Sequence, residues 1–117
     1  MLGVFFQHAT PEHPADPAVT KLLKHIEDTG KAKDKVTVDA GSLWDPTAGY
    51  FQWTGSLTTP PCSGGVYWLL QATPRRVAAE QVAAFTKHEG GYPGNARPTQ
   101  PLNGRRVRVH EPTGGAA

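Results

Sequence analysis

Apolar residues recur at helical spacing near the start of this chain. Asp16 is a good N-cap residue, and Pro17 follows it at the first helical position, where a missing N–H costs nothing. Gly30 is well placed to end the helix in a left-handed conformation. The residues between them predict a helix with one apolar stripe, formed by Val19, Leu22, Leu23 and Ile26.

A second, shorter helix is predicted over about residues 78–87, with Val82 and Phe85 three apart on its buried side. Other stretches are rich in aromatic or β-branched residues and are bounded by Gly, Pro or Asp, which is typical of strands. These predicted strands span residues 2–7, 36–38, 50–54, 66–71 and 107–109. Residues 41–49 and 89–99 lack such patterns, and we expect ordered irregular loops there.

Two of the predicted strands differ in how much of their surface is apolar. Residues 66–70 form a nearly continuous apolar run, which predicts a central strand covered on both faces. Val107, Arg108 and Val109 alternate instead, as in a strand with one face in water. Because strands outnumber helices, the predicted fold class is α+β with the sheet dominant.

Charge and composition narrow the class of protein. The chain has 12 basic and 10 acidic residues, so its net charge of +2 gives no argument for binding nucleic acid or a membrane surface. The basic cluster of Arg105, Arg106 and Arg108 is expected to be a solvated strand face. No stretch approaches the roughly 18 apolar residues of a membrane span, and the apolar run at residues 1–6 is too short for a secretory signal. We therefore expect a soluble chain without a signal peptide.

One motif in the chain is long and specific. Residues 56–61 read Ser-Leu-Thr-Thr-Pro-Pro, and Val-Tyr-Trp follows at 66–68. Together with Asn-Ala-Arg-Pro-Thr-Gln-Pro-Leu at 95–102, this sequence resembles the alpha-class carbonic anhydrases over nearly its whole length. The resemblance implies the C-terminal half of that fold, which has a large, mostly antiparallel central sheet with surface helices. It also implies a cis bond between Pro60 and Pro61.

The resemblance further implies a chemistry for these residues. Members of the family hydrate carbon dioxide to bicarbonate and a proton by means of a zinc-bound hydroxide. By match to the motif, the Thr58 hydroxyl would accept a hydrogen bond from that hydroxide and orient it, because one hydroxyl is both donor and acceptor. Thr59 would help to hold bicarbonate. The apolar wall, where uncharged carbon dioxide displaces water, would be formed by Leu57, Val66 and Trp68.

The zinc ligands of the family are missing from this sequence. A catalytic zinc of this kind needs three converging imidazoles, two of them from a His-x-His on one strand. The histidines form neither that pair nor a pair spaced by four on a helix; they are His8, His13, His25, His88 and His110. We therefore expect residues 1–111 to be a partial domain without its N-terminal half, inactive and without zinc by itself. We expect residues 112–117 to be a disordered tail.

Cys62 is the single cysteine of the sequence, so an internal disulfide is excluded. For this chain by itself we expect a buried free thiol. For the full-length protein, the resemblance implies a disulfide between Cys62 and a cysteine near the N-terminus, and with it a periplasmic or secreted location.

Two other function classes stay open beside the enzyme. A carbonic-anhydrase-like domain that has lost its zinc ligands can serve as a non-catalytic binding module, and a truncated, nonfunctional gene product is the remaining alternative. The partner expected for the enzyme is its small substrate, carbon dioxide or bicarbonate. Half of a sheet also exposes strand edges and apolar side chains, so we expect low solubility or self-association.

Overall fold

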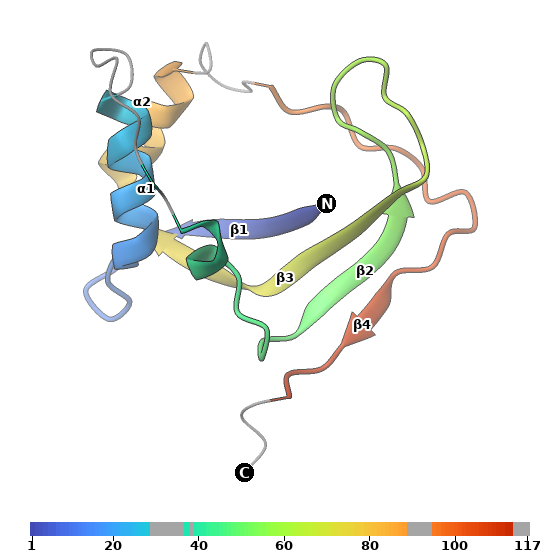
Figure 1. Ribbon diagram of the computed structural model, residues 1–117, viewed down its shortest axis with the longest axis horizontal. Coiled ribbons are helices and arrows are strands. Elements are labelled where there is room, and N and C mark those ends of the chain that lie inside the picture. The colour runs from blue at the N-terminus through green and yellow to red at the C-terminus, as the bar shows by residue number, and fades with distance from the viewer. Residues whose placement is uncertain (29–36, 38, 89–94, 114–117) are drawn as a thin grey trace. The chain divides into compact units, whose positions relative to one another are not determined.

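The computed structural model describes residues 1–28, 37, 39–88 and 95–113 (Figure 1). These residues form a small α+β fold dominated by strands, which confirms the predicted fold class. In chain order the elements are β1 (Leu2–His8), α1 (Pro17–Asp28), the 3-10 helix η1 (Ala40–Leu43), β2 (Tyr50–Gly55), β3 (Val66–Val77), α2 (Ala79–His88) and β4 (Arg108–His110).

The four strands form one mixed sheet in the order β1-β3-β2-β4. β2 is antiparallel to both β3 and β4. β1 runs in the same direction as β3, since the Leu69 amide donates to the Met1 carbonyl and, further along both strands, the Ala9 amide donates to the Val77 carbonyl. β3 therefore has a paired strand on each side, as its apolar run predicted.

The predicted elements are present in the structure, with differences at their ends. α1 begins at Pro17, and β3 continues six residues beyond the predicted end, to Val77. The 3-10 helix η1 includes residues 41–43, at the start of the irregular loop predicted for residues 41–49. Of the predicted strand at residues 36–38 only residue 37 is described, and it is not in a strand. The predicted helix end at Gly30 and residues 89–94 of the predicted loop lie outside the described residues.

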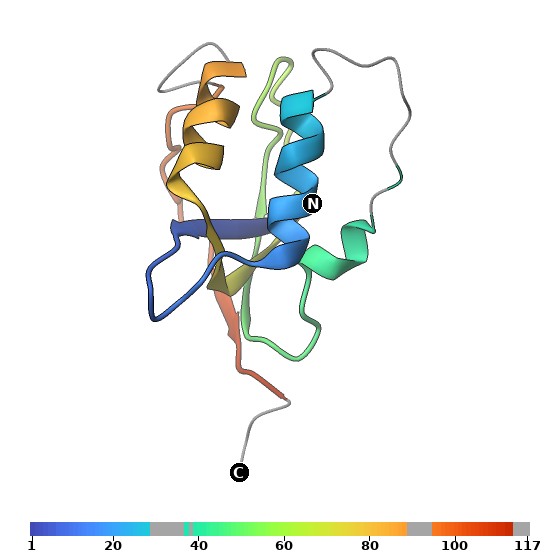
Figure 2. The same cartoon turned by 90° about the vertical axis from the view of Figure 1, so that its left-hand side faces the viewer.

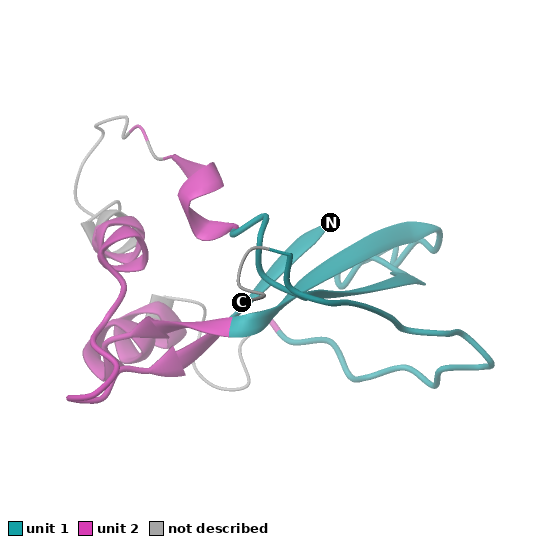
Figure 3. Ribbon diagram, turned by 90° about the horizontal axis from the view of Figure 1, so that it is seen from below, with its two compact units in different colours: residues 1–5, 45–73, 96–117 teal, residues 6–44, 74–95 magenta. Residues whose placement is uncertain are grey.

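By its internal contacts the chain divides into two compact units (Figure 3). Unit 1 comprises residues 1–5, 45–73 and 96–117. Unit 2 comprises residues 6–44 and 74–95. No helix within the described part of either unit is long and apolar enough to cross a membrane.

Unit 2 contains the buried apolar core of the described residues. Val19 of α1 and Val77 of β3 are 0% and 1% exposed. The two helices pack against each other (Figure 2), and the Gln81 side chain of α2 donates to a backbone carbonyl of α1, that of Thr20, at 3.1 Å. Phe85, predicted to lie on the buried side of α2, is 40% exposed. The predicted burial of Phe85 is therefore wrong. The spacing of Val82 and Phe85 places both on one side of α2, but no described residue covers that side fully at Phe85.

The start of α1 is fixed by Asp16, as the sequence predicted. Its Oδ1 accepts hydrogen bonds from the backbone amides of Ala18 and Val19, at 2.9 and 3.4 Å, which satisfies donors that the first helical turn leaves free. Its Oδ2 accepts from Arg75 Nε at 2.7 Å. Burial by itself raises the pKa of Asp16, but the bonds from Arg75 and the two amides outweigh it and hold this pKa below its usual value.

In unit 1, alternation along the strands gives the sheet an apolar face and a polar face. On the apolar face, Phe51 of β2 pairs with Leu70 of β3 and with Val109 of β4, and Trp53 pairs with Trp68. None of these side chains is fully buried, and Val109 is 61% exposed. The apolar face is therefore open to solvent within the part of unit 1 that the structure describes.

The polar face of unit 1 corrects the prediction that the central strand is covered on both faces. Tyr67 of β3 is 69% exposed. Its cross-strand partner is Thr54, whose side chain is too short to cover an aromatic ring. The described residues of unit 1 include no helix that would cover this face instead.

The last described residue of the chain makes a backbone hydrogen bond. The Thr113 amide donates to the Thr47 carbonyl at 3.0 Å, and both residues belong to unit 1. Residues 114–117 lie outside the described residues.

Candidate active site

Two stacked tryptophans form the centre of the apolar face of unit 1. The ring centroids of Trp53 and Trp68 are 5.9 Å apart and their planes are inclined by 9°. Gly55, the last residue of β2, lies beside both rings, and a Cβ placed there would come within 3.0 Å of Trp68 Cδ1. A residue without a side chain at this position therefore lets the two indoles lie close to the end of the strand.

The connection from β2 to β3 carries the threonines of the motif. The Leu57 amide donates to the Ser63 carbonyl at 2.9 Å, and the Cys62 amide donates to the Thr59 carbonyl at 2.8 Å. The Pro60–Pro61 bond lies within this second turn and is cis, as the resemblance implied. These bonds close the loop on itself and leave the side chains of Thr58 and Thr59 exposed.

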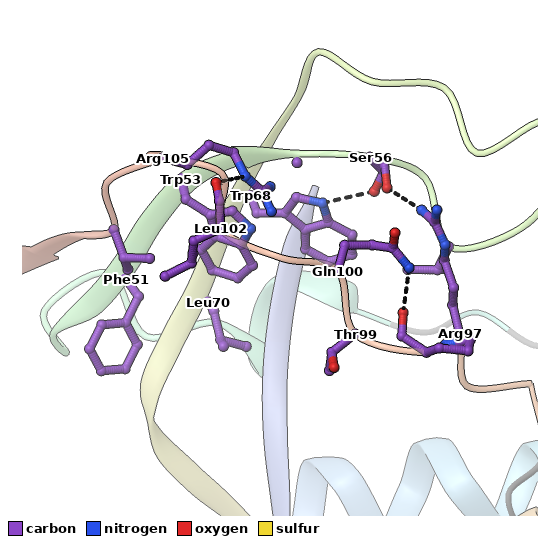
Figure 4. Close-up of a pocket in the computed structure, with 14 residues that line it drawn as sticks. Phe51, Trp53, Ser56, Trp68, Leu70, Arg97, Thr99, Gln100, Leu102 and Arg105 are labelled. Carbon is purple, nitrogen blue, oxygen red and sulfur yellow. Dashed lines mark hydrogen bonds between the residues drawn. The ribbon is translucent and has the colours of Figure 1, made fainter.

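Two side chains fasten this loop to the sheet (Figure 4). Trp68 donates its Nε1–H to the Ser56 carbonyl at 3.1 Å. Arg97, from the segment before β4, donates to the Ser56 hydroxyl and to the Leu57 carbonyl, the latter at 3.1 Å. The backbone on the N-terminal side of Thr58 is thus held from β3 and from the C-terminal segment at once.

Arg105 fastens the next part of the C-terminal segment in the same way. Its guanidinium donates to the carbonyls of Thr54, Pro101 and Leu102, at 2.8, 2.9 and 3.0 Å. The prediction that Arg105 belongs to a solvated face is therefore wrong. Its planar fork of donors joins the end of β2 to the backbone of the C-terminal segment.

These elements line an open, concave pocket of about 510 Å³. Of the site residues predicted from the sequence, Thr58 and Trp68 line it, whereas Leu57, Thr59 and Val66 do not. Val66 nevertheless points to the same face as Trp68, because the two residues are two apart on β3. The remaining lining residues are Phe51, Trp53, Gly55, Ser56, Leu70, Arg97, Pro98, Thr99, Gln100, Leu102, Arg105 and Val107.

The chemistry of the pocket suits a small uncharged molecule. Its floor consists of aromatic and aliphatic side chains, and its hydroxyl groups come from Ser56, Thr58 and Thr99. The guanidinium groups of Arg97 and Arg105 already donate to protein oxygens. The Ser56 hydroxyl already accepts from Arg97, so the hydroxyl groups of Thr58 and Thr99 are the ones that could donate to and accept from a ligand here.

The described residues do not form a site that would hold a zinc ion. Across the described ranges, no three His, Cys, Asp or Glu side chains come together as a metal site would require. His110 lies with its Nε2 2.8 Å from Gln52 Oε1 and stacks on Tyr50 at a centroid distance of 4.3 Å. The His110 ring thus has a structural partner on each side.

Cys62 is a free, half-buried thiol and has a positive φ of 56°. The prediction of a free thiol in this chain agrees with this, although the side chain is less buried than expected.

Sequence reasoning missed the residues that hold the loop. Residues 95–102 belong to the sequence that resembles the family, but no role was predicted for Arg97. An arginine between small and proline residues, in a segment without helix or strand periodicity, was the available signal. Proline-rich backbone has carbonyls without ladder partners, and an arginine side chain is suited to satisfy them.

Comparisons with known proteins agree with the geometry. Residues 1–111 match the family described as eukaryotic-type carbonic anhydrase. A carbonic anhydrase from Nostoc sp. is 36% identical over 107 residues, which are 92% of this chain and 39% of that protein. Alpha carbonic anhydrase 3 of Arabidopsis thaliana is 34% identical over 118 residues, or 95% of this chain and 40% of that protein.

A solved structure shows the same likeness in three dimensions. The alpha-carbonic anhydrase from Thermovibrio ammonificans, solved in complex with the inhibitor sulfanilamide, matches 91% of this chain and 45% of its own, with a TM-score of 0.72 and 36% identity. This chain therefore spans about two fifths of the length of the curated relatives described above.

Proposed function

Because this chain belongs to the eukaryotic-type, or alpha, carbonic anhydrase family, we propose that it takes part in the reversible hydration of carbon dioxide to bicarbonate and a proton. The chain covers about two fifths of the Nostoc and Arabidopsis relatives, so the activity belongs to a larger domain of which residues 1–111 form one part. The observation that carries the proposal is that Thr58 and Trp68 of the family motif line one apolar pocket.

In this proposal Thr58 is the catalytic residue of the chain. Its hydroxyl holds the oxygen that attacks carbon dioxide and directs a lone pair at the carbon, which saves orientational entropy in the transition state. The fastening of Ser56 and Leu57 by Arg97 supports this role, because it fixes the backbone just before Thr58. Thr59, the next residue, holds the bicarbonate product.

The apolar wall keeps water from the reacting carbon in the same proposal. Trp68 lines the pocket and Val66 shares its strand face, while Leu57 belongs to the loop that Arg97 holds. An uncharged gas molecule loses little on leaving water, whereas an ion loses much of its hydration, so such a wall favours carbon dioxide.

Zinc enters the proposal only through residues that this sequence does not contain. The described side chains do not fit the metal, and the sequence has no His-x-His. We therefore propose that the 117-residue chain by itself neither binds zinc nor hydrates carbon dioxide. Catalysis by the chain alone at a rate above that of buffer, lost on chelation and restored by zinc, would overturn this part.

A graft tests the proposed role of the residues that are present. In the graft, residues 1–111 of this chain replace the matching segment of the Thermovibrio ammonificans enzyme, which shares the fold at 36% identity. Stopped-flow measurement of carbon dioxide hydration compares the graft with its Thr58→Val variant, which keeps the shape of the side chain and removes the hydroxyl.

We expect the graft to be active and Thr58→Val to lower kcat/KM by about a hundredfold, as the loss of one hydrogen bond at a reacting oxygen commonly does. Thr73→Val, which changes an exposed threonine outside the motif and the pocket, is the matched control and should lower activity by less than about twofold. A folded, zinc-loaded graft without activity, or equal activities of the Thr58 variant and the control, would contradict the proposal.

We also propose that Cys62 forms a disulfide in the full-length protein, in a periplasmic or secreted location. The support is the resemblance together with the half-buried thiol, which has no partner cysteine in this sequence. Peptide mapping of the protein from its native source, under non-reducing conditions, tests this. Recovery of Cys62 as a free thiol would refute it.

A further inference from the structure

The polar face of the sheet in unit 1 has a hollow of its own, separate from the apolar pocket. Its volume is about 240 Å³. Register places its residues on one face, because Thr54 pairs with Tyr67 across β2 and β3, and Gln52 pairs with Arg108 across β2 and β4. Arg106, two residues before Arg108, also lines the hollow, and Trp53 lines both this hollow and the apolar pocket.

The two arginines of this hollow differ from every other arginine of the chain. Arg97 and Arg105 donate to loop carbonyls, Arg75 pairs with Asp16, and Arg76 donates to a backbone carbonyl. By contrast, the guanidinium groups of Arg106 and Arg108 have no hydrogen-bond or ion-pair partner anywhere in the described ranges. Both arginines are exposed, Arg108 at the start of β4 and Arg106 two residues before it.

Nothing in the lining of the hollow neutralises this charge. The lining contains no aspartate or glutamate. It contains the hydroxyl groups of Thr54 and Tyr67, of which Tyr67 is 69% exposed. The Gln52 side chain, the third neutral polar group, is held in place by the hydrogen bond between its Oε1 and His110 Nε2. Charged donors, hydroxyl donors and an exposed aromatic ring therefore gather without an acidic partner.

We propose that this hollow binds a tetrahedral oxyanion of the phosphate or sulfate type, held by Arg106 and Arg108. Guanidinium groups bind such anions through parallel N–H donors, and two of them balance the double charge of phosphate or sulfate. The Thr54 and Tyr67 hydroxyls supply further donors at the rim. The site lies on the opposite sheet face from Thr58 and does not depend on the proposed hydration of carbon dioxide.

Isothermal titration calorimetry of the 117-residue chain with inorganic phosphate tests this proposal, with sodium chloride keeping the ionic strength constant. We expect saturable binding with a dissociation constant in the millimolar range. The double variant Arg106→Gln/Arg108→Gln should weaken binding by about tenfold or more, because both charged donors are lost. The matched control Lys21→Gln/Lys24→Gln removes the same charge from exposed positions on α1 and should bind like the parent.

Two further measurements keep the result interpretable. Far-ultraviolet circular dichroism verifies that both double variants fold like the parent, and Arg106→Lys/Arg108→Lys, which keeps the charge, should retain part of the affinity.

Phenyl phosphate as a second probe distinguishes the sources of the anion. Tighter binding than that of phosphate indicates a group carried on a larger molecule, and equal binding indicates the free anion. Absence of saturable phosphate binding, or equal weakening in the lysine control, would overturn the proposal.

Discussion

Trp53 and Trp68 lie directly opposite each other on β2 and β3, with their rings stacked at a centroid distance of 5.9 Å. Trp68 also donates its Nε1–H to the Ser56 carbonyl. One side chain therefore joins the apolar face of the sheet to the loop that carries Thr58. Trp68 therefore contributes both to the wall of the pocket and to the position of Thr58.

In the graft, replacing Trp68 should lower the free energy of unfolding in two steps. Trp68→Phe removes the donor to Ser56 and should cost about 1 kcal/mol, the usual net value of one hydrogen bond. Trp68→Ala also removes the stacked ring and should cost about 3 kcal/mol. Urea unfolding measures both. Tyr67→Ala, on the exposed side of the same strand, should stay within about 0.5 kcal/mol of the parent, and a loss equal to that of Trp68→Ala would contradict this account.

Arg97→Gln should lower kcat/KM of the graft by about tenfold, because the loop before Thr58 loses its fastening and the hydroxyl is less well oriented. If Arg97 acts by positioning Thr58, its effect on kcat/KM should also depend on the Thr58 hydroxyl. In the Thr58→Val background, Arg97→Gln should change kcat/KM by less than about twofold, since no hydroxyl remains to be positioned.

Stopped-flow kinetics of the four proteins in this cycle, together with the exposed control Lys21→Gln, measure the coupling. If the two losses multiply in the double variant, Arg97 does not act through the Thr58 hydroxyl, and the positioning role is contradicted.

Asp16→Asn should make the stability of the graft less dependent on pH in the acid range. The folded-state pKa of Asp16 is lowered, so its carboxylate stabilises the fold fully above its unfolded value of about 4, and this stabilisation is lost as the pH falls through the folded value. Asparagine retains a capping oxygen but loses the ion pair with Arg75. The expected cost is about 1 kcal/mol at pH 7, shrinking toward zero near pH 2.

Urea unfolding at several pH values measures this difference. Glu12→Gln, at an exposed site without a hydrogen bond or ion pair in the described ranges, serves as the control. A cost for Asp16→Asn that is the same at pH 7 and pH 2 would show that the ion pair contributes nothing.

The 117-residue chain by itself should self-associate. Its buried apolar side chains in the described ranges are Val19 and Val77, whereas Leu102, Val107 and Val109 are 57%, 45% and 61% exposed. Sedimentation velocity should show a sedimentation coefficient that rises with concentration, because association removes this apolar surface from water. Val109→Lys should weaken the association. A monomer at all concentrations with one sharp unfolding transition would contradict the prediction.

Local structure followed closely from the sequence. The cap at Asp16 and the start of α1 depend on neighbouring residues, so spacing alone predicted them. The strands at β1, β2 and β4 were likewise found within one residue at most ends, since alternation and bounding glycines are local signals. The motif also predicted the cis bond at Pro60–Pro61 and the family itself.

The candidate site was predicted only in part. Thr58 and Trp68 were identified because they belong to a contiguous motif. The roles of Arg97 and Arg105 were not predicted, because each side chain donates to a carbonyl 40 or more residues away in the sequence. Both residues also lie in a segment without helix or strand periodicity. Nothing along the chain indicated that neighbouring arginines 105 and 106 would separate, one fastening a loop and the other facing the polar hollow.

The sequence by itself therefore determined the identity of the elements, the family and the chemical groups available to the site. Only the tertiary structure decided which of these groups meet. Strand pairing brings Trp53 against Trp68 and divides the arginines between two faces, because register is set by contacts between distant segments. Burial was decided in the same way, since an apolar run such as that of β3 specifies what a strand prefers to contact but not whether another part of the protein is there to cover it.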